Sequence, residues 1–288
     1  MDARVEEEVP VYAVSRPARQ VLPLVLSSPH SGRHYSAAFL AASRLDDQAL
    51  RGSEDSFVEE LFAGAPAIGA PLLAALFPRA YLDPNREPWE LDPRMFSEPL
   101  PDWVNSASQR VAAGLGTIAR VVSGGAEIYR DRLTFAEAER RVRTCHAPYH
   151  AALAGLVRET VERFGHCILL DCHSMPPGGG GGQRAMPDMV LGDCFGVSCA
   201  PRVTERAELI LRRAHYRVRR NTPYAGGYTT HHYGAPSRGV HGLQIEINRA
   251  LYMNPESRER RPEAMARLAE DMMLLLEGLG GLTPADLR

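Results

Sequence analysis

The stretch Cys167-Ile168-Leu169-Leu170-Asp171-Cys172-His173-Ser174-Met175-Pro176 decides the fold of this chain. Its apolar run, ended by a Pro-Pro-Gly turn, predicts a buried central strand of an α/β sheet. The run stops at Asp171 and His173, at the carboxyl end of the strand, where α/β folds place their ligands and chemistry. Alternation along a strand puts these two residues on one side and Cys172 on the other. Asp171 is therefore well placed to support His173 from behind and orient its imidazole.

Length and composition are those of an ordinary soluble globular protein. The 288 residues are 44% hydrophobic and 24% charged, so we expect one α/β domain over residues 1–288. Residues 1–20 would be an N-terminal extension and 262–276 a closing helix. The formal charge of −2 favours neither nucleic acid nor a membrane surface as a partner. No apolar run approaches the ~20 residues of a membrane-spanning helix.

The same features predict a cytoplasmic protein. The acidic N-terminus lacks the apolar core of a signal peptide. The five cysteines are odd in number and form no CxxC pair, which favours reduced thiols. A small molecule is then the expected partner, and the oligomeric state stays open.

A second strand also ends in a histidine. Val21–Leu26 is apolar and runs into Ser27-Ser28-Pro29-His30, with a proline and a glycine shaping the turn. Further on, Ser53 is expected to cap a helix over Glu54–Phe62. Its first turn would carry Glu54 and Asp55, where acids also simply complement the helix dipole.

Two further strand ends carry polar groups. Strand-like segments at Leu72–Phe77 and Ala80–Leu82 precede the loop Asp83-Pro84-Asn85-Arg86. A last buried strand, Val240–Ile247, has Glu246 inside an apolar run. Burying a carboxylate is costly without a partner or a role. Because burial also raises its proton affinity, Glu246 is a candidate general base.

The longest helical pattern spans Thr134–Phe164. A capping box at Thr134 opens it and Gly165 ends it, and Pro148 must kink or divide it. Its pair His146 and His150 imitates half a zinc site, but a proline between them and no glutamate argue against that role. His150 is instead expected to be a packed supporting residue.

The run Gly178–Gly182 follows the His173 strand. Five consecutive glycines cannot hold one conformation cheaply, so the run is either a lid hinge or a bulge. It lacks the Lys-Ser/Thr ending of a phosphate loop.

Two histidines and one acid suggest a metal site. His30 and His173, with Asp55 or Glu54 and an open fourth position, would make a catalytic zinc centre, because structural zinc sites are closed and usually cysteine-rich. Six segments in order resemble the N-formylglutamate amidohydrolase family: SSPHSGRHY, SEDSFVEELF, YLDPNREP, LLDCHSMP, GGYTTHHYG and HGLQIEINRALYM. The resemblance extends from about Leu24 to Met253.

The resemblance implies a fold and a site. The fold would be a mixed sheet flanked by helices, similar to zinc carboxypeptidases and to phosphorylase/hydrolase-like proteins. His30, Asp55 and His173 would bind one zinc ion per chain, with Asp55 preferred to Glu54 by the family's pattern. Substrate would contact the side chains of Asn85, Arg86, Arg33, His232 and Arg238. Asp171 and His150 would support the site, and Glu246 would be the catalytic base.

The implied reaction is hydrolysis of N-formyl-L-glutamate to formate and L-glutamate, a step of histidine degradation. Two positions depart from the family's pattern: Ala225, where a lysine is common, and His231, where an arginine is common. The alternatives are a deacylase for another N-acyl amino acid and a non-catalytic, metal-containing carboxylate-binding protein. A cysteine hydrolase using Cys172 is disfavoured, because alternation turns that thiol away from His173.

Overall fold

A mixed sheet forms the centre of the molecule. The computed structural model describes residues 10–122, 124–178 and 186–287, and within them one sheet has the strand order β1-β3-β2-β4-β7-β5-β6. β1 runs antiparallel to β3 and β5 antiparallel to β7, whereas the other neighbours are parallel. The strands are β1 Tyr12–Ser15, β2 Leu24–Ser28, β3 Leu72–Ala75, β4 Cys167–Met175, β5 Met189–Gly192, β6 Val218–Arg220 and β7 Val240–Asn248. The predicted fold class is confirmed.

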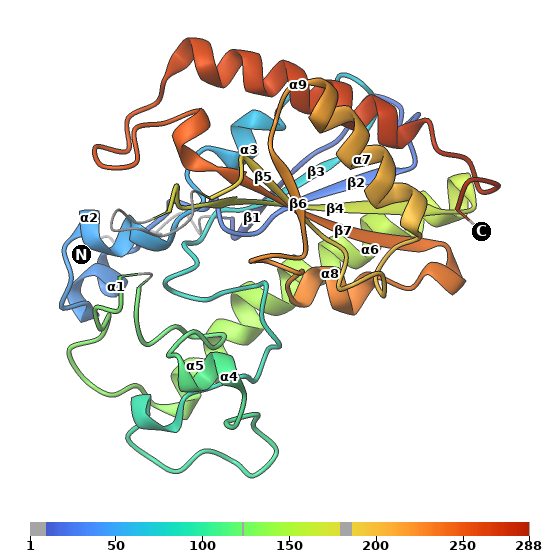
Figure 1. Ribbon diagram of the computed structural model, residues 1–288. Helices are drawn as coiled ribbons and strands as arrows, with labels where there is room; N and C mark the ends of the chain where they lie inside the picture. Colours follow the sequence, from blue (N-terminus) through green and yellow to red (C-terminus); the bar gives the residue numbers. More distant parts are fainter. Residues whose placement is uncertain (1–9, 123, 179–185, 288) are drawn as a thin grey trace, which may run out of the picture.

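Helices cover both faces of this sheet, as Figure 1 shows. α3, α7 and α9 lie on one face, and α6 and α8 on the other, while α4 and α5 belong to a separate excursion. The helices are α1 Ala37–Ala42, α2 Asp47–Leu50, α3 Val58–Leu61, α4 Gln109–Ala112, α5 Phe135–Arg141, α6 Ala147–Phe164, α7 Pro201–Arg213, α8 Tyr228–Tyr233 and α9 Pro262–Gly280. Short 3-10 turns lie at Arg51–Ser53, Pro93–Met95, Pro236–Arg238 and Arg249–Leu251.

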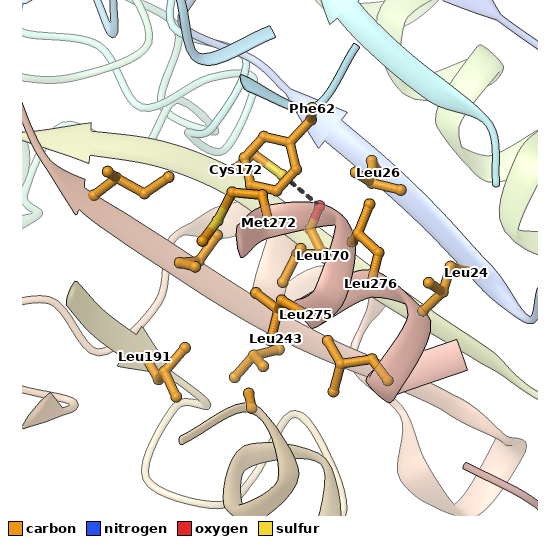
Figure 2. Close-up of a cluster of buried hydrophobic side chains, with 14 of the residues drawn as sticks. Leu24, Leu26, Phe62, Leu170, Cys172, Leu191, Leu243, Met272, Leu275 and Leu276 are labelled. Carbon is orange, nitrogen blue, oxygen red and sulfur yellow. Dashed lines mark hydrogen bonds between the residues drawn. The ribbon is translucent and has the colours of Figure 1, made fainter. Parts of the chain in front are cut away.

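The larger core lies between the sheet and α9. Alternate residues of β4, Ile168, Leu170 and Cys172, point into it together with Leu275 and Leu276 of α9 (Figure 2). Cys172 donates a hydrogen bond to its neighbour's carbonyl, Leu170 O, at 3.5 Å. Burial raises the pKa of this thiol well above its usual range, which disfavours a thiolate nucleophile. The expectation that Cys172 points away from His173 is confirmed.

The opposite face of β4 packs on α6. Leu169 of β4 lies in a second core with Tyr149 and Leu153 of α6. The hydroxyls of Tyr149 and Ser27 are 2.9 Å apart, so the last residues of β2 are tied to this helix. On this face of β4 the side chains are apolar up to Leu169 and polar at the carboxyl end, where Asp171 and His173 follow.

The long helical pattern over Thr134–Phe164 is divided in two. Thr134 caps α5 by accepting from Glu137 N, and Gly165 ends α6 with a positive φ of 77°; both boundaries were predicted. Between the helices, residues 142–146 form a π-helix, which often occurs at functional positions. Pro148 lies in the first turn of α6, where its missing N–H costs little.

The predicted helix over Glu54–Phe62 is wrong in most of its length. Only Val58–Leu61 is helical, because the backbone N–H of Asp55 donates to His30 O at 3.0 Å. That bond ties the acidic residues to the loop after β2 instead of to a helix turn. Phe57, with φ of 67°, then turns the chain into α3.

Two smaller expectations also need correction. Part of the supposed extension 1–20 forms edge strand β1, because its residues pair with β3. Ala80–Leu82 is a turn and no strand. The strand expected at Val21–Leu26 is present as β2, which begins directly after Pro23 and lies between β3 and β4.

No helix in the described part of the chain is long and apolar enough to cross a membrane. The expected hinge or bulge at Gly178–Gly182 falls, beyond its first glycine, outside the described residues.

Candidate metal centre and substrate cavity

Adjacent strands bring two histidines together. β2 and β4 are parallel neighbours, with Ser27 opposite Asp171, so the loop after β2 and the end of β4 lie at the same edge of the sheet. The Nδ1 atoms of His30 and His173 are 3.1 Å apart. Both side chains are buried.

Asp55 completes the group of donors. Its Oδ2 lies 3.3 Å from His30 Nδ1 and 3.1 Å from His173 Nδ1, and the three residues form a group that could hold a metal ion. Glu54 points elsewhere: its carboxylate accepts hydrogen bonds from Tyr35 and Ser56. Of the two acids left open by the residues alone, Asp55 is the one that meets the histidines.

A second carboxylate holds the far side of each imidazole. His30 Nε2 is 2.6 Å from Asp83 Oδ1, and His173 Nε2 is 2.9 Å from Asp171 Oδ2. A ring that donates its Nε2 proton to a carboxylate keeps a lone pair on Nδ1. Two such lone pairs and an oxygen of Asp55 therefore converge on one point.

This donor set fits a zinc ion. Bonds of about 2.0–2.1 Å around a tetrahedral zinc separate its ligand atoms by roughly 3.3–3.4 Å, close to the 3.1–3.3 Å found here. A cation also satisfies three electron-rich atoms that otherwise repel one another. Two histidines and one carboxylate leave a position open for substrate or water.

The other oxygen of Asp55 is bound as well. Oδ1 accepts hydrogen bonds from Arg249 Nη2 at 2.9 Å and from Ser174 Oγ at 3.2 Å. Burial opposes ionisation of Asp55, but contact with His173 and His30, whose Nδ1 atoms can carry a proton when no metal is bound, holds its pKa well below the usual range. The carboxylate is thus ionised, with Oδ2 turned toward the two histidines.

Glu246 lies beside this group. β4 and β7 pair in parallel with His173 opposite Glu246, and Gln244 Nε2 donates to Glu246 Oε1 at 2.9 Å. Burial raises the pKa of Glu246 to about 7, although His173 acts in the opposite direction when its ring is protonated. A carboxylate of this kind can take up and release a proton near neutral pH.

The loop after Asp83 packs against the donors. Asn85 Nδ2 donates to Asp171 Oδ2 at 3.1 Å, and its Oδ1 accepts from Thr229 N at 2.8 Å. Arg86 donates from Nε to Leu115 O and from Nη1 to its neighbour's carbonyl, Asn85 O, at 3.0 and 2.8 Å. Both side chains line the cavity, but Asn85 is largely committed to holding Asp171.

Two histidines of the helical segment hold this loop from behind. His150 Nε2 lies 2.8 Å from Pro84 O, and His146 Nε2 lies 3.0 Å from Arg86 O. Burial lowers the pKa of His150 to about 3 and also lowers that of His146, so both rings are neutral donors. His150, expected to support the site, thus contacts the loop that carries Asn85, and His146 contacts the same loop.

A cavity of about 430 Å³ opens over the donors. Its charged lining includes four arginines, Arg79, Arg86, Arg110 and Arg249. Of these, sequence reasoning assigned only Arg86 to substrate. It also left Asp83 and Tyr224, which line the same cavity, without a role. The signal for Asp83 was its place directly before Asn85 and Arg86, whereas Arg110 stands in a segment without any motif.

Three expected substrate contacts lie elsewhere. Arg33 pairs with Glu59 and Glu60, His232 stacks on Tyr228 in α8, and Arg238 is exposed in a 3-10 turn. Among the described residues that line the cavity, none of these three occurs. The ends of predicted strands and helices indicate at which edge of the sheet a site lies. They do not indicate which side chains of the loops point into the cavity.

Fold and donor set together define an α/β protein with a candidate mononuclear metal centre at the carboxyl edge of its sheet. Residues 22–253 match the family model described as N-formylglutamate amidohydrolase, and the chain belongs to this family.

Known proteins agree with this assignment. The chain is 30% identical over 243 residues to the N-formylglutamate deformylase of Pseudomonas aeruginosa, covering 82% of this chain and 84% of that protein. It is 28% identical over 238 residues to the deformylase of Pseudomonas putida, covering 81% and 82%. The crystal structure of N-formylglutamate amidohydrolase from Ralstonia eutropha JMP134 superposes with a TM-score of 0.87 at 37% identity, covering 94% of this chain and 98% of that one.

Proposed function

We propose that this protein is a zinc-dependent amidohydrolase that cleaves N-formyl-L-glutamate to formate and L-glutamate, the reaction predicted for histidine degradation. Family membership supports the reaction class, as do the names of the relatives in Pseudomonas. The observation that carries the proposal is Glu246, held in register beside His173 at the cavity floor. A protein that only bound carboxylates would not need a buried base at that place.

His30, Asp55 and His173 would hold the metal, with Asp83 and Asp171 orienting the two imidazoles. A zinc ion at this place supplies Lewis acidity, which polarises a carbonyl and makes water a nucleophile near neutral pH. Arg249 and Ser174 keep Asp55 turned toward the histidines. The donor set is thus fixed before substrate arrives, which reduces the reorganisation that the reaction requires.

Glu246 would act on protons at both stages. It accepts a proton from the attacking water as the C–O bond forms at the formyl carbon. It then delivers that proton to the amide nitrogen as the C–N bond breaks, so that formate and a free amine leave. Its raised pKa of about 7 suits both directions of transfer, because a useful catalytic pKa lies near the working pH.

Arg86 would bind the substrate's α-carboxylate. Its guanidinium is anchored by Leu115 O and Asn85 O, so it is fixed before binding, and its Nη2 lies 3.8 Å from Asp83. Asn85, the preceding residue, contacts the Asp171 that supports His173. A carboxylate on Arg86 therefore lies near the donors, as the carboxylate adjacent to the scissile amide must.

A formate-release assay tests the function. Purified protein is incubated with N-formylglutamate and with N-acetylglutamate, and zinc content is measured on the same sample. We expect formate release with about one zinc per chain, and little acetate release. Turnover of the acetyl compound alone would favour the other deacylase, and binding of N-formylglutamate without formate would favour the carboxylate-binding protein.

A further inference from the structure

The four guanidiniums of the cavity are of two kinds. Arg79 donates to Asp83 Oδ2 at 2.7 Å, and Arg249 donates to Asp55 Oδ1 at 2.9 Å. These two arginines neutralise carboxylates of the metal centre. Their charge is therefore largely committed within the protein.

Arg86 and Arg110 have no such commitment. Over the described ranges, the shortest approach of Arg86 to a carboxylate is 3.8 Å, to Asp83, and that of Arg110 is 3.8 Å, to Glu90. Both distances exceed a hydrogen bond. The cavity thus presents two guanidiniums whose charge no carboxylate neutralises through a hydrogen bond.

Two available guanidiniums match the two carboxylates of the proposed substrate. N-formylglutamate carries two carboxylates, one next to the scissile amide and one at the end of the side chain. We propose, resting on the function proposed above, that Arg110 binds the side-chain carboxylate and makes the enzyme selective for an acidic N-formyl amino acid. Arg86 and Arg110 then neutralise one substrate carboxylate each.

The positions of the two arginines indicate which substrate carboxylate each one binds. Arg86 is 14% exposed and follows Asn85, which contacts the support of the metal centre. Arg110 is 42% exposed and comes from α4, in the excursion outside the sheet (Figure 1). The deeper guanidinium suits the carboxylate close to the amide, and the outer one suits the carboxylate three carbons further along.

The surroundings of Arg110 agree with this role. Leu115, Ala119 and Val121 also line the cavity and offer apolar contact to the methylenes of a glutamate side chain. Ser108 caps α4 by accepting from Val111 N at 3.0 Å and donates to Glu90. The backbone that carries Arg110 is therefore fixed, while its guanidinium stays available.

The test compares two substrates of equal shape. N-formylglutamine replaces the side-chain carboxylate by a neutral amide, so the ratio of kcat/KM for N-formylglutamate to that for N-formylglutamine measures recognition of the charge. In Arg110→Gln this ratio should fall by about 10- to 100-fold, the loss expected for a hydrogen bond to a charged group. Arg110→Lys keeps the positive charge but cannot donate two parallel hydrogen bonds to a carboxylate, so it should retain part of the ratio.

Arg158→Gln is the matched control. Arg158 is exposed on α6 and pairs loosely with Glu162 at 3.9 Å, so the same substitution removes one positive charge outside the cavity. In Arg158→Gln the ratio of kcat/KM for the two substrates should equal that of the wild type. Zinc content of every variant confirms an intact centre.

Three outcomes are distinguishable. A fall of the ratio in Arg110→Gln, with an unchanged ratio in Arg158→Gln, supports the proposal. If kcat/KM of Arg110→Gln falls equally for both substrates, or does not fall, the proposal is overturned while the deformylase function stays intact. Wild-type protein that releases formate from neither substrate refutes the proposed function, and the role of Arg110 fails with it.

Discussion

His173 on β4 and Glu246 on β7 are paired in register across two parallel strands. Residues at paired positions point to the same face of a sheet, so the carboxylate stands beside the imidazole without the help of any loop. His173, a candidate metal ligand, and Glu246, a candidate proton acceptor, therefore stand on two central strands whose residues are nearly all buried.

Glu246→Gln should abolish most turnover. Glutamine keeps the volume of the side chain and its contact with Gln244 but cannot accept a proton. Since a positioned base contributes about 10² to 10⁴-fold, kcat should fall by that factor, while zinc content and KM stay near the wild type. Stopped assays of formate release measure the change, and the exposed Glu162→Gln is the control.

The pH profile gives a second readout of the same residue. Burial raises the pKa of Glu246 to about 7, and the base works only when deprotonated. Wild-type kcat/KM, which reports groups of the free enzyme, should therefore fall as the pH drops through that pKa and level off above it. This acidic limb should be missing from the residual activity of Glu246→Gln; an unchanged limb would assign it to another group.

Metal content should depend on Asp55 and not on its neighbour. His30→Ala, His173→Ala and Asp55→Ala each remove one of three ligands and should lower zinc content strongly, as measured by elemental analysis. Glu54→Ala is the control, because its carboxylate binds Tyr35 and Ser56 instead. Full zinc in Asp55→Ala with zinc lost in Glu54→Ala would reverse the assignment.

The carboxylates behind the histidines should tune metal affinity. Asp83→Asn and Asp171→Asn keep the shape but weaken the bonds to the two Nε2 atoms. Loss of such a partner typically costs about 10–100-fold in metal affinity, which competition with a chelator measures. Asp188→Asn, at a surface pair with Arg217, should behave as the wild type. Equal affinity in all three would show that the imidazoles need no support.

Arg86→Lys should raise KM for N-formylglutamate and leave zinc content intact. Lysine cannot reproduce two parallel hydrogen bonds to a carboxylate, nor the bonds to Leu115 O and Asn85 O that fix the guanidinium. Steady-state kinetics measure the effect. An unchanged kcat/KM would show that Arg86 does not bind the α-carboxylate.

The sequence predicted the buried strands and the polar groups at their ends. Alternation placed Asp171 and His173 opposite Cys172, because a strand has a fixed period that neighbours do not alter. A separate argument singled out Glu246 as a candidate base, because a carboxylate inside an apolar run is costly to bury without a partner or a role. Thr134 and Gly165 were found as helix boundaries because capping depends on local chemistry.

The remaining parts depend on contacts between distant segments. Asp55 leaves the expected helix because its N–H bonds to His30 O, a partner that no local pattern reveals. Arg33 was expected in the site, but Glu59 and Glu60 bind it outside. Arg110, in the short helix α4, and Arg249, in the turn directly after β7, both line the cavity, and neither position has a periodic signal.

The part of the excursion that follows Arg86 packs in a third core, in which Leu91, Ile118 and Ile128 are fully buried and to which Phe39 of α1 also belongs. The proposed ligands and the base come from the sheet and from the loops that follow its strands, whereas Arg110 and Leu115 come from this outer part of the excursion. Recognition of the side-chain carboxylate and reactivity thus reside in parts of the chain that pack in different cores. New substrate preferences can arise by rebuilding the outer part while the reactive edge stays unchanged, and grafting the segment after Arg86 between relatives is a direct route to changing selectivity.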